Sequence, residues 1–120
     1  MTNNQSDNSL GKITISREVI ATLAGVGATE CIGVVGMVSS NFFSDGLTQL
    51  LGKESLSKGV NVKYDGETLQ IVVNVVVGYG TNIPIIAQNI VENVTYIVEK
   101  FTGLKVDKVE INVSGIKMLD

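Results

Sequence analysis

The segment from Val60 to Gly78 alternates apolar and polar residues on both sides of an Asp-Gly pair, and this pattern constrains the fold most. A period of two is typical of a β-strand with one buried face, and Asp-Gly is a strong signal for a two-residue turn between antiparallel strands. We therefore expect a β-hairpin with Asp65 and Gly66 at the centre of its turn. The pairs that follow from this turn are Tyr64 with Glu67, Val62 with Leu69, and Val60 with Ile71.

The second face of the longer strand is also partly apolar, because Val72 and Val76 alternate with the buried row. An apolar area on the outer face of a sheet needs a cover. We expect a second subunit to cover this area, which predicts self-association.

A first helix is predicted after Ser16, whose hydroxyl can cap the helix start. Gly25, Gly27 and Ala28 make one side of this helix thin, so another element can approach closely. This thin side is a second surface through which the chain could self-associate. The apolar stripe expected to face the core consists of Ile20, Ala24, Gly27 and Cys31.

A second, longer helix is predicted to begin around Asn82 or Ile83 and to end at Gly103 in a left-handed cap. Glu92 and Glu99 fall on its far side and are expected to be solvated. The stripe expected to be buried consists of Ile83, Ala87, Ile90, Val94, Ile97, Val98 and Phe101.

The remaining segments complete an α+β domain with a mostly antiparallel sheet of about four strands and helices on one face. The expected order is β-α-(β)-α-β-β-α-β. Residues 1–9 are polar without periodicity and are expected to be a disordered tail, with a single domain over residues 10–120. The other assignments are strands at Lys12–Ser16 and Lys108–Gly115, a weak strand within Ile32–Val38, a short surface helix from Ser44 to Gly52, and a polar loop at Lys53–Gly59.

Charge and cysteine content exclude several classes of function. A net charge of -3 gives no broad attraction for nucleic acid or anionic lipid. One cysteine cannot form an internal disulfide, and the first ten residues lack the features of a signal peptide, so a cytoplasmic location is expected. The most apolar run, Ile71–Val77, is far shorter than the roughly 20 residues that span a bilayer, which predicts no direct membrane insertion.

Cys31 is the obvious candidate for a nucleophile, and we interpret it instead as a small buried apolar residue. The chain has no histidine that could act as its base. The neighbouring Glu30 and the end of the first helix both disfavour a thiolate. The acidic residues are spread singly, so no catalytic residue, metal site or cofactor is expected.

Two glycine motifs carry weak binding signals. The segment Gly33–Gly36 reads "GVVG" and matches the GxxG loop that clamps nucleic-acid backbone, but no basic residue lies between its glycines. The segment Gly78–Gly80 reads "GYG" before a helix start, where backbone amides can hold an anion. Structural turns explain both motifs more simply.

The sequence blocks together resemble a known family. They are "GKITIS", "VIATLAGVGATECIGVVGM", "LSKGV", "VVVGYGTNIPIIAQNIVENV" and "TGLKVDKVEINVSGI", which run from Gly11 to Ile116. They are similar to the alkaline shock protein family (Gls-type) of envelope stress response proteins in Gram-positive bacteria, especially its small YloU-like branch. The resemblance implies an abundant cytoplasmic protein without catalytic activity that self-associates and gathers near the membrane through a small membrane-anchored partner. It also suggests a link to a fatty-acid kinase-type enzyme.

The function expected from this resemblance is that of a non-enzymatic scaffold or adaptor in the cell-envelope stress response. The alternative is a small-ligand or acyl-binding accessory protein of lipid metabolism, for which the aliphatic core and the "GYG" turn are hints. Nucleic-acid binding through "GVVG" is a third and weaker hypothesis, and no nucleic-acid partner is expected. The residues singled out as possible contact sites are Gly33, Gly36, Lys58, Gly59, Tyr79 and Gly80.

Overall fold

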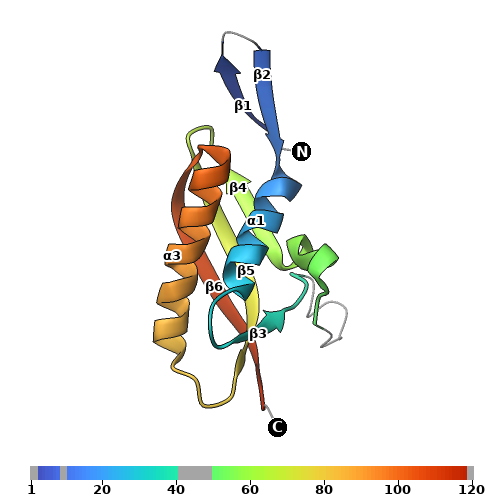
Figure 1. The fold of residues 1–120 in the computed structure, drawn as a ribbon, viewed down its shortest axis with the longest axis vertical. Helices are drawn as coiled ribbons and strands as arrows, with labels where there is room; N and C mark the ends of the chain where they lie inside the picture. The colour runs from blue at the N-terminus through green and yellow to red at the C-terminus, as the bar shows by residue number, and fades with distance from the viewer. Residues whose placement is uncertain (1–2, 9–10, 41–49, 119–120) are drawn as a thin grey trace.

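The computed structural model describes residues 3–8, 11–40 and 50–118 (Figure 1). Within them, one four-stranded sheet carries two long helices on one face, and a separate hairpin extends from the N-terminal end of the first helix. The elements are β1 (Asn3–Asn8), β2 (Gly11–Ser16), α1 (Arg17–Thr29), β3 (Val34–Met37), the 3-10 helix η1 (Lys53–Gly59), β4 (Val60–Tyr64), β5 (Thr68–Gly78), α3 (Ile83–Thr102) and β6 (Lys105–Lys117).

Strand β5 is the centre of the sheet. It pairs in parallel with β6 over its whole length, and it pairs antiparallel with β4 through Leu69–Val73 and with β3 through Val75–Val77. Because a strand has two edges, β3 and β4 share the edge opposite β6. The α+β class, the four strands, the mostly antiparallel pairing and the helices on one face are all as the sequence predicts.

The β4–β5 hairpin forms, but the predicted register is wrong by two residues. Tyr64 pairs with Leu69, and the backbone N–H of Asp65 donates to the Thr68 carbonyl at 3.3 Å, so Gly66 and Glu67 are the central turn residues. Gly66 has a φ of 101°, and no residue other than glycine has a positive φ in the described part of the chain. A turn centred on Asp65 and Gly66 would need positive φ at both positions, whereas a turn with glycine first needs it only there. A shift of two keeps the same residues on the buried face.

Four other predictions concern the shorter segments. The weak strand within Ile32–Val38 is confirmed as β3, whereas the predicted polar loop at Lys53–Gly59 is η1, which has Leu56 buried on its inner side. The helix predicted from Ser44 to Gly52 lies mostly outside the described residues. Where the sequence predicts a disordered tail, Asn3–Asn8 is paired with β2, because a backbone ladder does not require apolar side chains.

The caps predicted at Ser16 and Gly103 are present, and Asn82 caps the start of α3, which the sequence places around Asn82 or Ile83. The Ser16 hydroxyl accepts a hydrogen bond from the Val19 N–H at 3.2 Å, and the Asn82 side chain accepts one from the Ile85 N–H at 3.2 Å. Gly103 ends α3 with a φ of 74° and donates to the Glu99 carbonyl at 2.9 Å. These contacts satisfy backbone groups that have no partner inside a helix.

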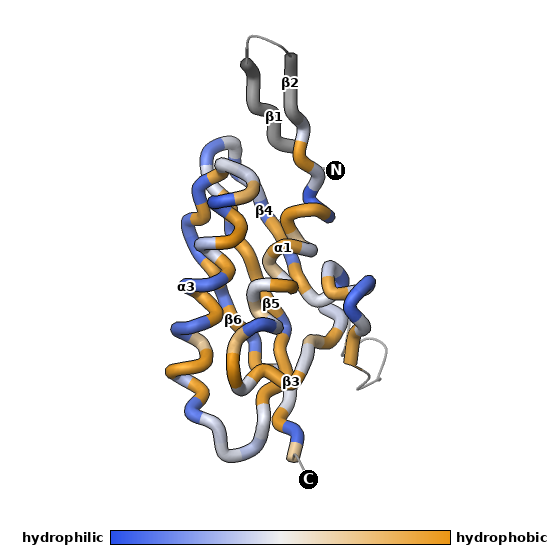
Figure 2. Tube along the Cα trace, in the orientation of Figure 1, coloured by the Kyte–Doolittle hydropathy of each residue, from blue (hydrophilic) through white to orange (hydrophobic). Residues whose placement is uncertain are grey.

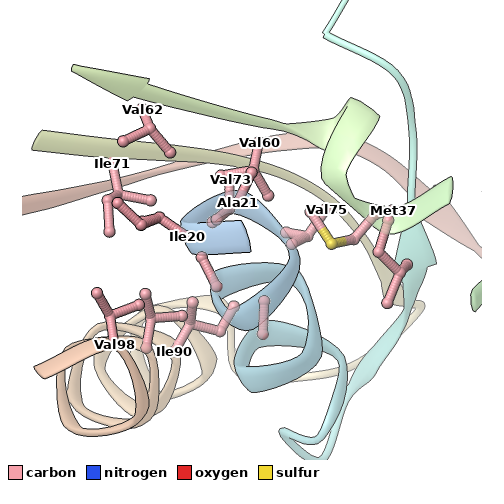
Figure 3. Close-up of a cluster of buried hydrophobic side chains, with 14 of the residues drawn as sticks. Ile20, Ala21, Met37, Val60, Val62, Ile71, Val73, Val75, Ile90 and Val98 are labelled. Carbon is pink, nitrogen blue, oxygen red and sulfur yellow. The ribbon is translucent and has the colours of Figure 1, made fainter. Parts of the chain in front are cut away.

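The core lies between the sheet and the two helices (Figure 3). One row of β5 side chains packs against both helices. Figure 2 shows that apolar residues recur along β5 and along both helices. Phe101 is wrongly predicted to be buried, since it is 65% exposed in the last turn of α3, and Ile86 takes a core position that was not predicted. The fully enclosed contributors are Leu69, Ile71, Val73, Val75 and Val77 from β5, Ile20, Ala24 and Ala28 from α1, and Ile90, Val94 and Val98 from α3.

The thin side of α1 packs as tightly as predicted. A Cβ atom placed on Gly25 would lie 2.9 Å from the Leu56 Cβ of η1, and one on Gly27 would lie 3.3 Å from the Ile97 Cδ1 of α3. The Asn93 side-chain amide donates to the Gly27 carbonyl at 2.7 Å and joins the two helices. This side of α1 is therefore covered within one copy of the chain.

Candidate contact surfaces

The residues singled out from the sequence fall into two groups. Gly33, Tyr79 and Gly80 lie at the end of the molecule where α1 leads into β3 and β5 leads into α3 (Figure 1). Gly36, Lys58 and Gly59 lie around β3 and the end of η1. The structure thus brings each set of three together but does not form one site from all six.

Backbone hydrogen bonds hold the first group in place. The Gly33 carbonyl accepts from the Gly78 N–H at 3.0 Å, and the Tyr79 N–H donates to the Lys117 carbonyl at 2.9 Å. Gly33 has a φ of 98°, which strongly favours glycine, and a Cβ there would lie 2.5 Å from the Ile86 Cδ1, so the end of that side chain would have to shift. Gly33 therefore has a packing role, whereas Tyr79 projects its ring into solvent.

Five large apolar side chains are exposed around this first group. They come from the α1–β3 turn, the β5–α3 turn, the first turn of α3 and the end of β6. The hydrogen bonds above join the α1–β3 turn and the end of β6 to the end of β5, and α3 follows β5 after a short connection. Their exposed fractions run from 54% for Ile85 to 92% for Ile32. We name this surface the apolar end, and its members are Ile32, Tyr79, Ile85, Ile116 and Met118. Exposed apolar groups gathered in one place mark interaction sites more often than singly scattered ones do.

Apart from Tyr79, the members of the apolar end do not stand out in the sequence as contact residues. The sequence predicts Ile32 to lie in a short buried strand or turn, and Ile85 and Ile116 fit the patterns of a helix and a strand. The available signal is that Ile32 and Tyr79 occupy connections between elements, where polar residues are more common.

The second group serves packing. A Cβ on Gly59 would lie 2.7 Å from the Val38 carbonyl oxygen, and one on Gly36 would lie 3.3 Å from the Leu50 Cδ2. The Lys58 side chain is exposed, while its carbonyl accepts from the Ser40 N–H at 2.9 Å. Because Val34–Met37 is a strand of the sheet, the "GVVG" motif does not form the open loop of a nucleic-acid clamp.

The outer face of the sheet is less apolar than its valines suggest. Val76 is only 8% exposed, and Val72 is half-buried. Between them Asn74 donates to the Gly59 carbonyl at 3.1 Å and accepts from the Asn112 side-chain amide at 3.1 Å. A groove of about 440 Å³ lies beside Val76 and adjoins the apolar end, with Val38, Leu50, Val76, Gly115, Ile116 and Met118 among its lining residues.

Cys31 is half-buried, not fully buried as predicted, and its contacts are those of a structural thiol. Its Sγ donates to the Gly27 carbonyl at 3.5 Å. Burial raises the pKa of the Cys31 thiol, and the negative charge of Glu30 raises this pKa further. Among the described residues, no three acidic, cysteine or histidine side chains gather where they could hold a metal ion.

Glu99 differs from the prediction that it is solvated like Glu92. Its Oε2 accepts from the Val106 N–H at 2.9 Å, which fixes the start of β6 beneath the last turn of α3. Glu92 is exposed as predicted. The carboxylate of Glu99 therefore has a structural role.

Residues 5–118 match the profile of the alkaline shock protein 23 family, which is described as having a cell envelope-related function. The chain belongs to this family. The match includes both helices, the whole four-stranded sheet and the apolar end. The resemblance noted from the sequence blocks is thus confirmed.

Relatives in this family align with most of the chain. The chain is 46% identical over 108 residues to the uncharacterized protein YloU of Bacillus subtilis, and the alignment covers 90% of both chains. It is 40% identical over 109 residues to the uncharacterized protein Spy1614 of Streptococcus pyogenes, covering 91% of this chain and 90% of that one. It is also 34% identical over 111 residues to the uncharacterized protein YqhY of Bacillus subtilis, covering 92% of this chain and 81% of that protein.

No solved structure matches the chain. Among the helices in the described parts of this family member, none has the length and apolar content needed to cross a bilayer.

Proposed function

We propose that this protein is a non-enzymatic cytoplasmic scaffold or adaptor of the cell-envelope stress response. In this proposal it self-associates and is held near the membrane by a small membrane-anchored partner protein. Membership of a family with a cell envelope-related function supports the pathway. The apolar end is the observation that carries the adaptor role, because its exposed apolar side chains offer a contact surface for another protein.

The apolar end suits a protein partner better than direct insertion into a bilayer. It consists of side chains from turns and strand ends, and the carbonyl of Lys117 between Ile116 and Met118 is already bonded to Tyr79. Aromatic residues such as Tyr79 are enriched in protein interfaces, where they are often among the residues that contribute most to binding. Insertion of an amphipathic helix into lipid would instead need one continuous apolar helix face that is exposed. The apolar face of α3 is buried in the core.

Membrane fractionation of native cells that carry tagged variants tests this proposal. The Ile32→Ser/Tyr79→Ser variant removes two exposed side chains of the apolar end, and we expect it to move from the membrane fraction to the soluble fraction. The control variant is Tyr96→Ser/Phe101→Ser, which removes two exposed aromatic rings towards the other end of α3 and should fractionate like the wild type. Equal fractionation of both variants, with unchanged circular dichroism, would contradict the adaptor role of the apolar end.

A second candidate function uses the groove beside Val76. Its volume of about 440 Å³ is within the range of small-ligand sites, which supports an acyl-binding accessory of lipid metabolism. Native mass spectrometry of the purified protein should then show bound fatty acid that is lost on Val76→Asp substitution. A spectrum without added mass, also after incubation with a fatty acid, would remove this candidate.

A further inference from the structure

Strand β6 leaves one long edge of the sheet open. It has 13 residues, and in the described part of the chain it pairs only with β5. The opposite edge of the sheet consists of the much shorter strands β4 and β3, with five and four residues. A long unpaired edge presents a row of backbone donors and acceptors to any strand that can align with it. Native proteins usually shorten or cover such an edge, so its occupant needs to be identified.

The surfaces expected from the sequence to mediate self-association are largely occupied within one copy of the chain. The thin side of α1 packs against Leu56 and α3, as described above. On the outer face, Asn74 and its hydrogen bonds separate Val72 from the buried Val76. Self-association therefore needs another surface, and the free edge of β6 is available.

Charged residues near the middle of β6 specify the kind of strand that can pair with it. Lys108 and Glu110 point to the outer face of the sheet, as their pairing with Gln70 and Val72 shows. Their side chains are 63% and 51% exposed and lie 3.6 Å apart from Nζ to Oε1. Charged side chains protect an edge against arbitrary partners, but they favour a strand with the complementary order of charges.

We propose that a second copy of this chain occupies the edge, with the two β6 strands antiparallel and related by a two-fold axis at Val109. In this register Lys108 of each copy faces Glu110 of the other, so two opposite-charge pairs form. An axis at Lys108 or at Glu110 would instead place like charges directly opposite each other. The proposal rests on the self-association in the proposed function and names the surface that provides it. The two sheets would join into one eight-stranded sheet with all helices on the same side.

A cysteine scan tests this register. In a Cys31→Ser background, the Val109→Cys variant places two thiols opposite each other, and paired residues of antiparallel strands have the Cα separation that a disulfide needs. We expect Val109→Cys to form covalent dimers under mild oxidation and the control Asn61→Cys, exposed on β4 at the opposite edge, to stay monomeric. Covalent dimers of Ile111→Cys, without dimers of Val109→Cys, would overturn the register. Failure of all β6 cysteines to cross-link would overturn the edge pairing.

Charge exchange provides an independent test by light scattering and sedimentation. Lys108→Glu and Glu110→Lys each convert two attractive pairs into two repulsive ones, and we expect each to weaken dimerisation about tenfold. The double variant Lys108→Glu/Glu110→Lys restores opposite charges across the axis and should dimerise like the wild type. Both side chains are exposed, so folding should be preserved, and thermal unfolding verifies it.

The outcomes separate this inference from the proposed function. An oligomeric wild type whose state does not respond to the charge variants would overturn β6 pairing and leave the scaffold proposal standing. A wild type that is monomeric at every concentration would overturn both the pairing and the self-association in the proposed function.

Discussion

The side-chain amide of Asn112 on β6 donates to the side-chain oxygen of Asn74 on β5 at 3.1 Å, across the parallel strand pair. Asn74 in turn donates to the carbonyl of Gly59, which is buried at the end of η1. One asparagine in the middle of an apolar strand thus joins β6, β5 and the segment that leads into β4. It also interrupts the outer face of the sheet, which the valine pattern alone predicts to be a docking surface.

Replacing Asn74 with alanine should destabilise the protein. Asn74 is buried, and its loss leaves the Gly59 carbonyl without this hydrogen bond, for which we expect a cost of about 1–3 kcal/mol in the free energy of unfolding. Urea unfolding measures this change. Asn112→Ala serves as the control and should cost less, because Asn112 is exposed. An Asn74→Ala protein as stable as the wild type would show that this network does not contribute to stability.

Gly25→Ala should also destabilise the protein, although glycine to alanine within a helix usually stabilises it by about 0.5–1 kcal/mol. The new methyl group would lie 2.9 Å from the Leu56 Cβ, which is attached to backbone and cannot rotate away. We expect a net loss of about 1–2 kcal/mol from overpacking. Gly27→Ala provides the comparison, since its nearest neighbour is the flexible end of Ile97 and its cost should be smaller. Greater stability of Gly25→Ala than of the wild type would refute the close packing of α1 on η1.

The difference between predicted and observed structure follows from what each sequence signal encodes. Caps and helical spacing depend on neighbouring residues, so Ser16, Asn82 and Gly103 define the ends of α1 and α3 correctly. Helical spacing also predicts the side of α3 on which Phe101 lies. It does not predict whether another element extends far enough along α3 to cover the Phe101 side chain. The bond from Glu99 to Val106 depends on how β6 returns beneath α3, which no local pattern specifies.

The candidate surfaces were less predictable than the fold. Gly33 and Gly59 stand out in the sequence as glycines in short motifs, and the structure explains them by close packing. The open edge of β6 depends on strand order, because the same alternating pattern would suit a central or an edge strand. The exposure of Ile32 likewise depends on the conformation of its turn, in which the neighbouring Cys31 and Gly33 are partly buried and the Ile32 side chain points into solvent.

The β4–β5 turn should lose stability at low pH because of Asp65. Hydrogen bonds from the backbone N–H groups of Thr68 and Glu67 lower the pKa of the Asp65 carboxyl. A pKa that is lower in the folded state stabilises the fold above the unfolded-state pKa, and this contribution disappears as the pH falls through the folded-state pKa. The wild type should therefore unfold at a higher temperature than Asp65→Ala at neutral pH, and this difference should shrink in acid.

Asp65→Asn is the matched control for this titration, because its side-chain oxygen can accept the same hydrogen bonds without a charge. The difference in unfolding temperature between Asp65→Asn and Asp65→Ala should stay constant over the same pH range, after correction for the shared titration of other groups. A wild-type advantage over Asp65→Ala that persists unchanged below the lowered pKa would contradict the role of the carboxylate.

Cys31 should react slowly with thiol reagents in the folded protein. Burial raises the pKa of its thiol, Glu30 raises that pKa further, and only the thiolate reacts. Glu30→Gln removes the negative charge, so we expect this variant to have a lower thiol pKa and faster labelling by a chromogenic disulfide at mildly alkaline pH. Labelling in urea gives the rate of the accessible thiol. If the native wild type reacted as fast as the unfolded chain, the thiol would be neither buried nor electrostatically suppressed, and its interpretation as a packing residue at the end of α1 would have to be abandoned.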